Sequence, residues 1–169
     1  YWRDDYGWRK VEAQLNSYPN FVTEIDGLDI HFLHIRSANP AARPLVLTHG
    51  WPGSVLEFLD VIEPLSADYH LVIPSLPGYG FSGKPAEAKW SVEHIAAGWD
   101  ALMRALGYDR YFAQGGDWGS AVTCAIGGNH ADHCAGIHVN MIVGQPDPST
   151  MSDLTDDEKA YLARFGWYR

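Results

Sequence analysis

The sequence predicts an α/β fold in which a mostly parallel sheet follows an antiparallel hairpin. Short apolar runs of strand length alternate with stretches whose apolar residues recur at helical spacing, as in parallel sheets joined by helices. Ahead of them, two alternating segments flank Asp26-Gly27, a dipeptide that favours a two-residue hairpin turn. The composition, 46% hydrophobic and 20% charged over 169 residues, suits one domain with a sizeable core.

The N-terminal half supplies the hairpin and the first buried strand. A short helix is expected at residues 8–15, where apolar residues recur at helical spacing. The hairpin strands at 21–25 and 28–35 alternate between apolar and polar residues. A continuous apolar run at 45–47 is typical of a strand buried on both faces. Helical spacing returns at 55–65 and predicts the first crossover helix.

The next elements repeat this alternation. A buried strand is expected at 69–73, and a loop rich in Pro and Gly, PSLPGYGFSG, ends it. A long amphipathic helix is expected at 91–106, because Ser91 is a good first residue and Gly107 a good stop. The remaining elements are a strand at 111–114, a helix at 118–129 and a strand at 136–139.

Three segments are expected in the domain organisation. Residues 1–20 are an N-terminal arm rich in aromatic residues, and residues 21–143 are the N-terminal part of an α/β core. Residues 144–169 begin with linker composition, QPDPSTMSDLTDDEK, and lead into a helix at 156–165. Trp2, Trp8, Trp90 and Trp99 are expected to be packing anchors.

Charge and composition exclude several classes of function. The net charge of −9, with no basic run, disfavours nucleic acid as a partner. No stretch of eighteen apolar residues predicts a membrane span, and the first residues have no signal-peptide pattern. Two cysteines cannot form a disulfide framework, which favours a reducing compartment. We therefore expect a soluble, cytoplasmic protein.

The most informative motif is GGDWGS, residues 115–120, which lies where a strand is expected to become a helix. It has the form of the G-x-S-x-G turn of serine hydrolases, with an aspartate in place of the serine. Gly115, Gly116 and Gly119 allow a tight turn, which is expected to raise Asp117 above the sheet. The backbone N–H of Trp118 then points to an oxyanion formed beside it.

A second motif, HGWPGS, follows the first buried strand and is expected to reach the same site. There the backbone N–H of Trp51 supplies the second oxyanion donor, supported by His49, Gly50 and Pro52. An aspartate nucleophile suits a saturated carbon electrophile such as an epoxide. It forms an ester, which water can hydrolyse, whereas a serine would form an ether. Asp117 also needs no base, because an aspartate with a pKa of about 3.9 is ionised at neutral pH.

The chain resembles the N-terminal portion of a microsomal-type epoxide hydrolase of the α/β-hydrolase superfamily. The resemblance rests on four stretches in order: the Trp-rich arm with YPNF and the hairpin, HGWPGS, PSLPGYGFS, and GGDWGS. It implies an enzyme that opens an epoxide to a vicinal diol, with Asp117 as nucleophile and the backbones of Trp51 and Trp118 as the oxyanion hole. It also implies a cis Trp51-Pro52 bond.

The resemblance further implies parts that are not in these 169 residues. A family member continues with a helical lid that carries two tyrosines, and then with the acid and the histidine that activate water. His130, His133 and His138 follow Asp117 within the next expected helix and strand, so none is expected to be that base. The chain is expected to be truncated before or at the lid, with an open sheet edge and an uncovered apolar helix face.

Two other functions stay open. A haloalkane or haloacid dehalogenase would share the aspartate nucleophile and the following tryptophan, whose indole can hold a halide. The chain could instead be a non-catalytic fragment, or one half of a two-chain assembly completed by another polypeptide. A homodimer or a missing C-terminal part is the expected partner that would cover its exposed surface. No cofactor and no metal are predicted, because the spacing of Cys124, His130, His133 and Cys134 fits no common zinc module. The expected ligands are a small epoxide and water.

Overall fold

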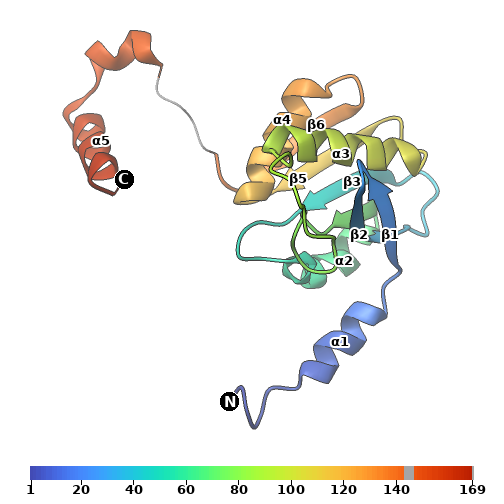
Figure 1. The fold of residues 1–169 in the computed structure, drawn as a ribbon. Helices are drawn as coiled ribbons and strands as arrows, with labels where there is room; N and C mark the ends of the chain where they lie inside the picture. The colour runs from blue at the N-terminus through green and yellow to red at the C-terminus, as the bar shows by residue number, and fades with distance from the viewer. Residues whose placement is uncertain (143–146, 169) are drawn as a thin grey trace.

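The computed structural model describes residues 1–142 and 147–168 and contains a sheet of six strands in the order β1-β2-β4-β3-β5-β6 (Figure 1). The strands are β1 (Asn20–Ile25), β2 (Leu28–Ile35), β3 (Arg43–Thr48), β4 (Tyr69–Pro74), β5 (Tyr111–Gly115) and β6 (Cys134–Val139). The α-helices are α1 (Trp8–Asn16), α2 (Leu59–Ser66), α3 (Val92–Ala105), α4 (Trp118–Asn129) and α5 (Asp156–Tyr168). Two 3₁₀ helices, η1 (Val55–Phe58) and η2 (Pro148–Asp153), complete the set.

The sheet has the predicted mixture of directions. β1 and β2 form an antiparallel hairpin, and β2 joins β4 in antiparallel fashion. The pairs β3-β4, β3-β5 and β5-β6 are all parallel. At the hairpin turn, Asp26 and Gly27 both have positive φ, at 48° and 79°, as a two-residue turn between twisted strands requires. An α/β sheet behind an N-terminal hairpin is therefore confirmed.

The strands β3 and β4 are buried on both faces, as the continuous apolar runs predict. Val46 and Val72 face α3 and α4, in a core that also holds Trp99. Leu47 and Leu71 point to the opposite face, where they pack with η1 and α2. The parallel part of the sheet is thus an apolar layer between helices, and its strands end at one common edge.

Some element boundaries differ from the predictions. The helix expected at 55–65 is divided into η1 and α2, and the Ser54 side chain accepts from the N–H of Leu56 at its start. A 3₁₀ turn is frequent at the N-terminus of an α-helix, and the spacing of apolar residues does not distinguish the two. β6 begins at Cys134 rather than 136, because Cys134 pairs with Tyr111 across a register shift. α5 extends to Tyr168 rather than 165.

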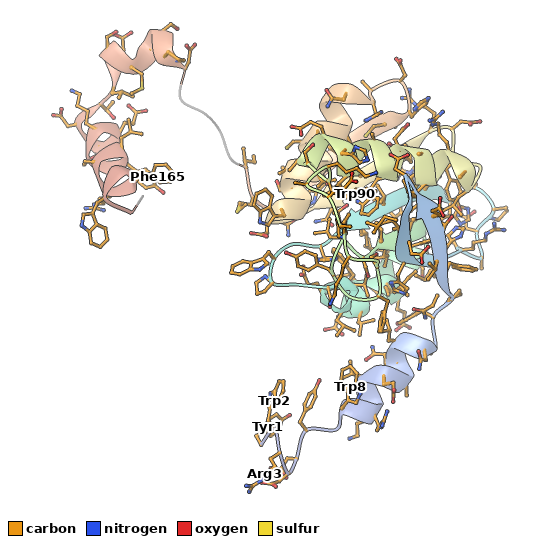
Figure 2. All side chains as sticks on the ribbon, in the orientation of Figure 1. Tyr1, Trp2, Arg3, Trp8, Trp90 and Phe165 are labelled. Carbon is orange, nitrogen blue, oxygen red and sulfur yellow. The ribbon has the colours of Figure 1, made fainter. Side chains whose placement is uncertain are left out.

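The N-terminal arm lies apart from the sheet except at its end. Leu15 is buried against the β3 and β4 side of the core, whereas Trp2 and Trp8 are 84% and 49% exposed (Figure 2). Trp99 is fully buried and Trp90 packs against the core. The prediction of a packing anchor is therefore confirmed for Trp99 and Trp90 and wrong for Trp2 and Trp8 in the described structure. These two indoles face no core layer there.

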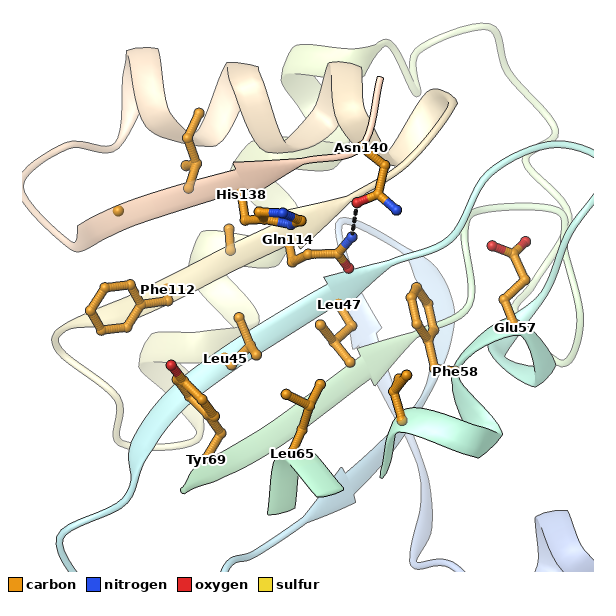
Figure 3. A pocket seen from close by; sticks show the side chains of 14 residues that line it. Leu45, Leu47, Glu57, Phe58, Leu65, Tyr69, Phe112, Gln114, His138 and Asn140 are labelled. Atoms are coloured by element: carbon orange, nitrogen blue, oxygen red, sulfur yellow. Dashed lines mark hydrogen bonds between the residues drawn. The ribbon is translucent and has the colours of Figure 1, made fainter. Parts of the chain in front are cut away.

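The sheet has an open edge and an apolar face that the helices cover only in part. Among the strands of the described residues, β6 pairs only with β5 and is an edge strand, on which Ile137 is 45% exposed. Beside α2, the sheet face carries a groove of about 620 Å³ (Figure 3). Leu45, Leu47 and Phe112 form part of its floor. An uncovered apolar surface therefore lies on this face of the sheet, between α2 and the β6 edge, and exposed apolar side chains are also present on a helix, where Tyr161 and Trp167 of α5 are 74% and 88% exposed.

The linker boundary and the membrane-span prediction can be compared with the structure only for the described residues. The linker expected from residue 144 begins among residues 143–146, which lie outside the described residues, so the predicted boundary there stays a prediction. Within residues 1–142 and 147–168, no helix combines the length and the apolar character that a membrane crossing requires.

Candidate active site

Asp117 lies on the tight turn that joins β5 to α4. β5 ends at Gly115 and α4 begins at Trp118, so two residues reverse the direction of the chain. Asp117 has φ 52° and ψ −126°, a conformation that residues with a side chain rarely adopt. Its side chain is exposed at the carboxyl edge of the parallel strands. Such an edge is where ligands bind in open α/β sheets.

Close backbone packing explains two of the three glycines of the turn. A Cβ on Gly115 would overlap the carbonyl of Gly119, and a Cβ on Gly119 would overlap the carbonyl of Thr48. A Cβ on Gly116, by contrast, would meet Asn140 at an ordinary contact distance of 3.6 Å. The expectation that a tight turn needs glycine therefore fits Gly115 and Gly119, but steric crowding does not require it at Gly116.

The HGWPGS loop brings a second backbone N–H to the same carboxylate. The N–H of Trp51 donates to Asp117 Oδ1 at 2.7 Å, and the N–H of Trp118 also donates to this carboxylate. A Cβ on Gly50 would lie 2.6 Å from Asp117 Oδ1, so only glycine allows the loop to approach this closely. The Trp51-Pro52 bond is cis, as the resemblance implies.

These hydrogen bonds stabilise the ionised form of the Asp117 carboxyl. The N–H of Trp51, and then the N–H of Trp118, lower the pKa of the Asp117 carboxyl below its usual value, and burial opposes them only weakly. Donors to the ionised form favour it. The site thus presents an exposed carboxylate with one face held by backbone donors.

We expect the Asp117 carboxyl to titrate below the ordinary aspartate pKa of about 3.9. Because the folded-state pKa is lowered, the carboxylate contributes stability above the unfolded value, and this contribution is lost as pH falls through the folded value. The carboxyl ¹³C shift of Asp117, followed by NMR from pH 7 downward, measures the midpoint. A midpoint above about 3.9 would contradict the two N–H contacts.

His49 braces the loop from below as a buried, neutral imidazole. The N–H of Leu76 donates to His49 Nε2 at 3.0 Å, and His49 Nδ1 lies 2.9 Å from the carbonyl oxygen of Gly50. Because Nε2 accepts, this network assigns the proton to Nδ1. Burial lowers the pKa of His49, while the Gly50 carbonyl and Glu57 oppose the shift. His49 therefore positions the loop and is not available as a base.

Several supporting residues are not predicted by the sequence. The N–H of Asn140, directly after β6, donates to the carbonyl oxygen of Gly115 at 3.2 Å. The Asn140 side chain accepts from Gln114 at 2.9 Å, and the Ser120 hydroxyl donates to the carbonyl oxygen of Met141. The segment after β6 therefore ties down the turn that carries Asp117. Ser120 is the last residue of the GGDWGS motif, and this position is the one signal in the sequence for these supporting residues.

The other titratable groups that follow Asp117 lie elsewhere. His133 Nδ1 is 2.9 Å from the buried carboxylate of Asp100, and His130 Nδ1 is 3.7 Å from it. This cluster lies beside the amino ends of β5 and β6, where Tyr111 pairs with Cys134. Four residues of strand separate it from the Asp117 edge, about 13 Å at 3.3 Å per residue. Both histidines are therefore remote from Asp117.

His138 is exposed on β6 and lines the groove of Figure 3. Cys124 is exposed on α4, whereas Cys134 is buried and its Sγ lies 3.4 Å from the carbonyl oxygen of Gly136. In the described part of the chain, no group of three or more His, Cys, Asp or Glu side chains has the arrangement of a metal site.

Comparison with known proteins finds epoxide hydrolase and α/β-hydrolase matches that together cover the length of the chain. The epoxide hydrolase N terminus family matches residues 1–58, and the alpha/beta hydrolase fold family matches residues 43–169. A putative epoxide hydrolase of Stigmatella aurantiaca is 47% identical over 97% of this chain and 40% of its own length. Epoxide hydrolase 1 of Oryctolagus cuniculus is 39% identical over 83% of this chain and 34% of its own length.

Solved structures of epoxide hydrolases match the fold of this chain. The Aspergillus niger epoxide hydrolase matches with a TM-score of 0.81 and 40% identity, over 96% of this chain and 45% of that one. The juvenile hormone epoxide hydrolase of Bombyx mori matches with a TM-score of 0.77 and 40% identity, over 83% of this chain and 40% of that one. The chain spans less than half the length of these relatives. It belongs to the epoxide hydrolases of the α/β-hydrolase superfamily and corresponds to their N-terminal portion.

Proposed function

We propose that this chain carries the nucleophile and the oxyanion hole of an epoxide hydrolase site. The observation that supports it best is the carboxylate of Asp117, exposed on a strained turn and held on one side by the N–H groups of Trp51 and Trp118. Backbone donors aimed at a carboxylate oxygen are also aimed at the oxyanion of an ester on that carboxylate. The names of the relatives supply the substrate class, an epoxide.

The first step of the proposed reaction is attack by the free carboxylate oxygen on an epoxide carbon. A C–O bond of the ring breaks, the ring oxygen takes a proton, and an alkyl ester of Asp117 forms. The oxygen that accepts from Trp51 remains as the ester carbonyl oxygen. Water then attacks the carbonyl carbon, and the oxyanion forms between the two N–H groups. Collapse of this intermediate releases the diol and restores the carboxylate, which now holds an oxygen atom from water.

Hydrolysis of the ester requires a base for the water. His49 is buried and neutral, and His130 and His133 contact Asp100. We propose that a base, its acid partner and groups that speed protonation of the ring oxygen come from the further length that the relatives have. In this chain alone, solvent water supplies the proton to the ring oxygen, which is enough for the first step but leaves the ester without a base for its hydrolysis. In this chain alone the ester is therefore expected to accumulate.

The experiment is exposure of the purified chain to a small aryl epoxide, followed by intact-mass measurement and peptide mapping. We expect one adduct per chain, located on Asp117 and stable to dialysis, because the two N–H donors orient a carboxylate that is ionised at neutral pH. An adduct on another residue, or none on folded protein, would contradict the proposal. In a longer form that turns over, ¹⁸O from labelled water should enter Asp117 before the diol.

A dehalogenase is the second candidate, and one observation favours it. The indole of Trp118 is 56% exposed beside Asp117, where its N–H could hold a departing halide. Chloroalkanes and bromoalkanes would then alkylate Asp117 and release halide. Halide release without any reaction with epoxides would favour the dehalogenase, whereas an epoxide adduct alone would exclude it.

A further inference from the structure

A second cavity, of about 560 Å³, lies beside the candidate site on the opposite side of the sheet from the groove of Figure 3. Its walls come from the loop after β4, the first turns of α3 and the first turns of α4. The side chains that define it are mainly apolar or aromatic: Leu76, Tyr79, Trp90, Ile95, Trp118 and Val122. A cavity of this size and composition is typical of a site for a small apolar group.

The cavity adjoins Asp117 through the neighbouring residue Trp118. Trp118, whose N–H reaches the carboxylate, also lines the cavity, and Val122 lies one helical turn further on the same face of α4. On the other wall, the N–H of Leu76 and the ring of Tyr79 contact the buried imidazole of His49. His49 precedes the turn that presents the Trp51 N–H. Both walls are therefore built from groups that hold the oxyanion donors.

The loop that forms one wall is held in place by hydrogen bonds. The N–H of Gly78 donates to the carbonyl oxygen of Gly83, and the N–H of Gly83 donates to the carbonyl oxygen of Asp29 on β2. The Ser82 hydroxyl donates to the carbonyl oxygen of Ser75. Trp90 packs edge-on against His94 of α3, with 4.7 Å between the ring centroids. The cavity is thus preformed, and a ligand does not have to order the loop.

We propose that this cavity binds the substituent of the epoxide, and that it selects neutral alkyl or aryl substituents. This inference rests on the proposed function, since it assigns the epoxide ring to Asp117 and the substituent to the space between Trp118 and Trp90. Glu87 is the one charged side chain among the lining residues. A substituent that ends in a carboxylate would meet Glu87 and is disfavoured, whereas a neutral hydrocarbon exchanges water for aromatic and aliphatic walls.

The test uses terminal 1,2-epoxyalkanes of increasing length and measures the second-order rate constant for adduct formation on Asp117 in the full chain. We expect the rate constant to rise about threefold to fourfold for each CH₂ that enters the cavity, from about 0.8 kcal/mol per buried CH₂, and then to level off. An ω-carboxylate analogue of equal length should lose this gain, and Glu87→Gln should restore part of it.

Matched variants distinguish the cavity from general hydrophobicity. Ile95→Phe and Val92→Phe place bulk in the cavity from α3, and Ala97→Phe places the same side chain on the exposed face of that helix. The first two should remove most of the gain with chain length. Ala97→Phe should behave as the wild type. Thermal unfolding confirms that each variant folds, and two filling positions guard against the failure of one.

The outcomes separate the two proposals. Adducts on Asp117 whose rate constants are independent of length, or equally length-dependent in Ile95→Phe and Ala97→Phe, would overturn the cavity assignment and leave the proposed function intact. Absence of an Asp117 adduct even with epoxypropane would overturn the proposed function, and the cavity assignment with it.

Discussion

Replacing Asp117 with Asn is expected to lower the rate constant for adduct formation with small epoxides by about 1,000-fold or more. An amide has nearly the same shape as a carboxylate and can still accept from the N–H of Trp51, but its oxygen is a far weaker nucleophile. Because the side chain is exposed, the substitution should leave the fold intact. Intact-mass measurement after a fixed exposure to epoxide gives the rate constants.

Asp147 provides a matched control within the same chain. It is also exposed, and hydrogen bonds from the Ser149 hydroxyl and N–H lower the pKa of its carboxyl. It therefore matches Asp117 in exposure and in the direction of its pKa shift, but it lies outside a strand-to-helix turn. Asp147→Asn should leave the adduct unchanged. Equal loss in both variants, or an adduct that persists in Asp117→Asn, would mean that the reactive group is elsewhere.

Local sequence patterns were sufficient for much of the fold. The Asp26-Gly27 turn and the bounds of α4 follow from turn chemistry and from glycines that mark an element's ends, and both agree with the structure. Element boundaries that depend on pairing with a distant segment were harder to predict. The start of β6 depends on the pairing of Cys134 with Tyr111, and apolar spacing cannot reveal that register shift. The division between η1 and α2 is likewise invisible to a pattern that both helix types share.

In the candidate site, too, some contacts could be predicted from the sequence and others could not. The meeting of Trp51 with Asp117 could be anticipated, because parallel strands end at one edge and both motifs follow such strands. The roles of Leu76 and Asn140 could not. Each acts through a backbone N–H, which every residue other than proline carries, so its identity gives no signal. Only the tertiary contacts show that these two segments brace the site.

Gly119→Ala is expected to have the largest effect on stability, a loss of about 3 kcal/mol or more in the free energy of unfolding. A Cβ at this position would overlap the carbonyl oxygen of Thr48 and lie 2.8 Å from that of His49. These are backbone atoms at the end of β3, so no side-chain rotation relieves the clash. To accommodate the methyl group, α4 must move away from β3, and the N–H of Trp118 moves with it. Urea unfolding measures the loss.

Two glycines in the same region make the comparison specific. Gly128 lies in α4 with open space around its Cβ position, so Gly128→Ala should stabilise the chain by up to about 1 kcal/mol through helix propensity. Gly116→Ala, beside Asp117, should change stability little and leave the adduct in place. Similar unfolding midpoints for Gly119→Ala and Gly128→Ala would contradict the close contact between α4 and β3. Because that contact holds Trp118 above the sheet, the stability of the turn and the position of the Trp118 N–H beside Asp117 should be lost together.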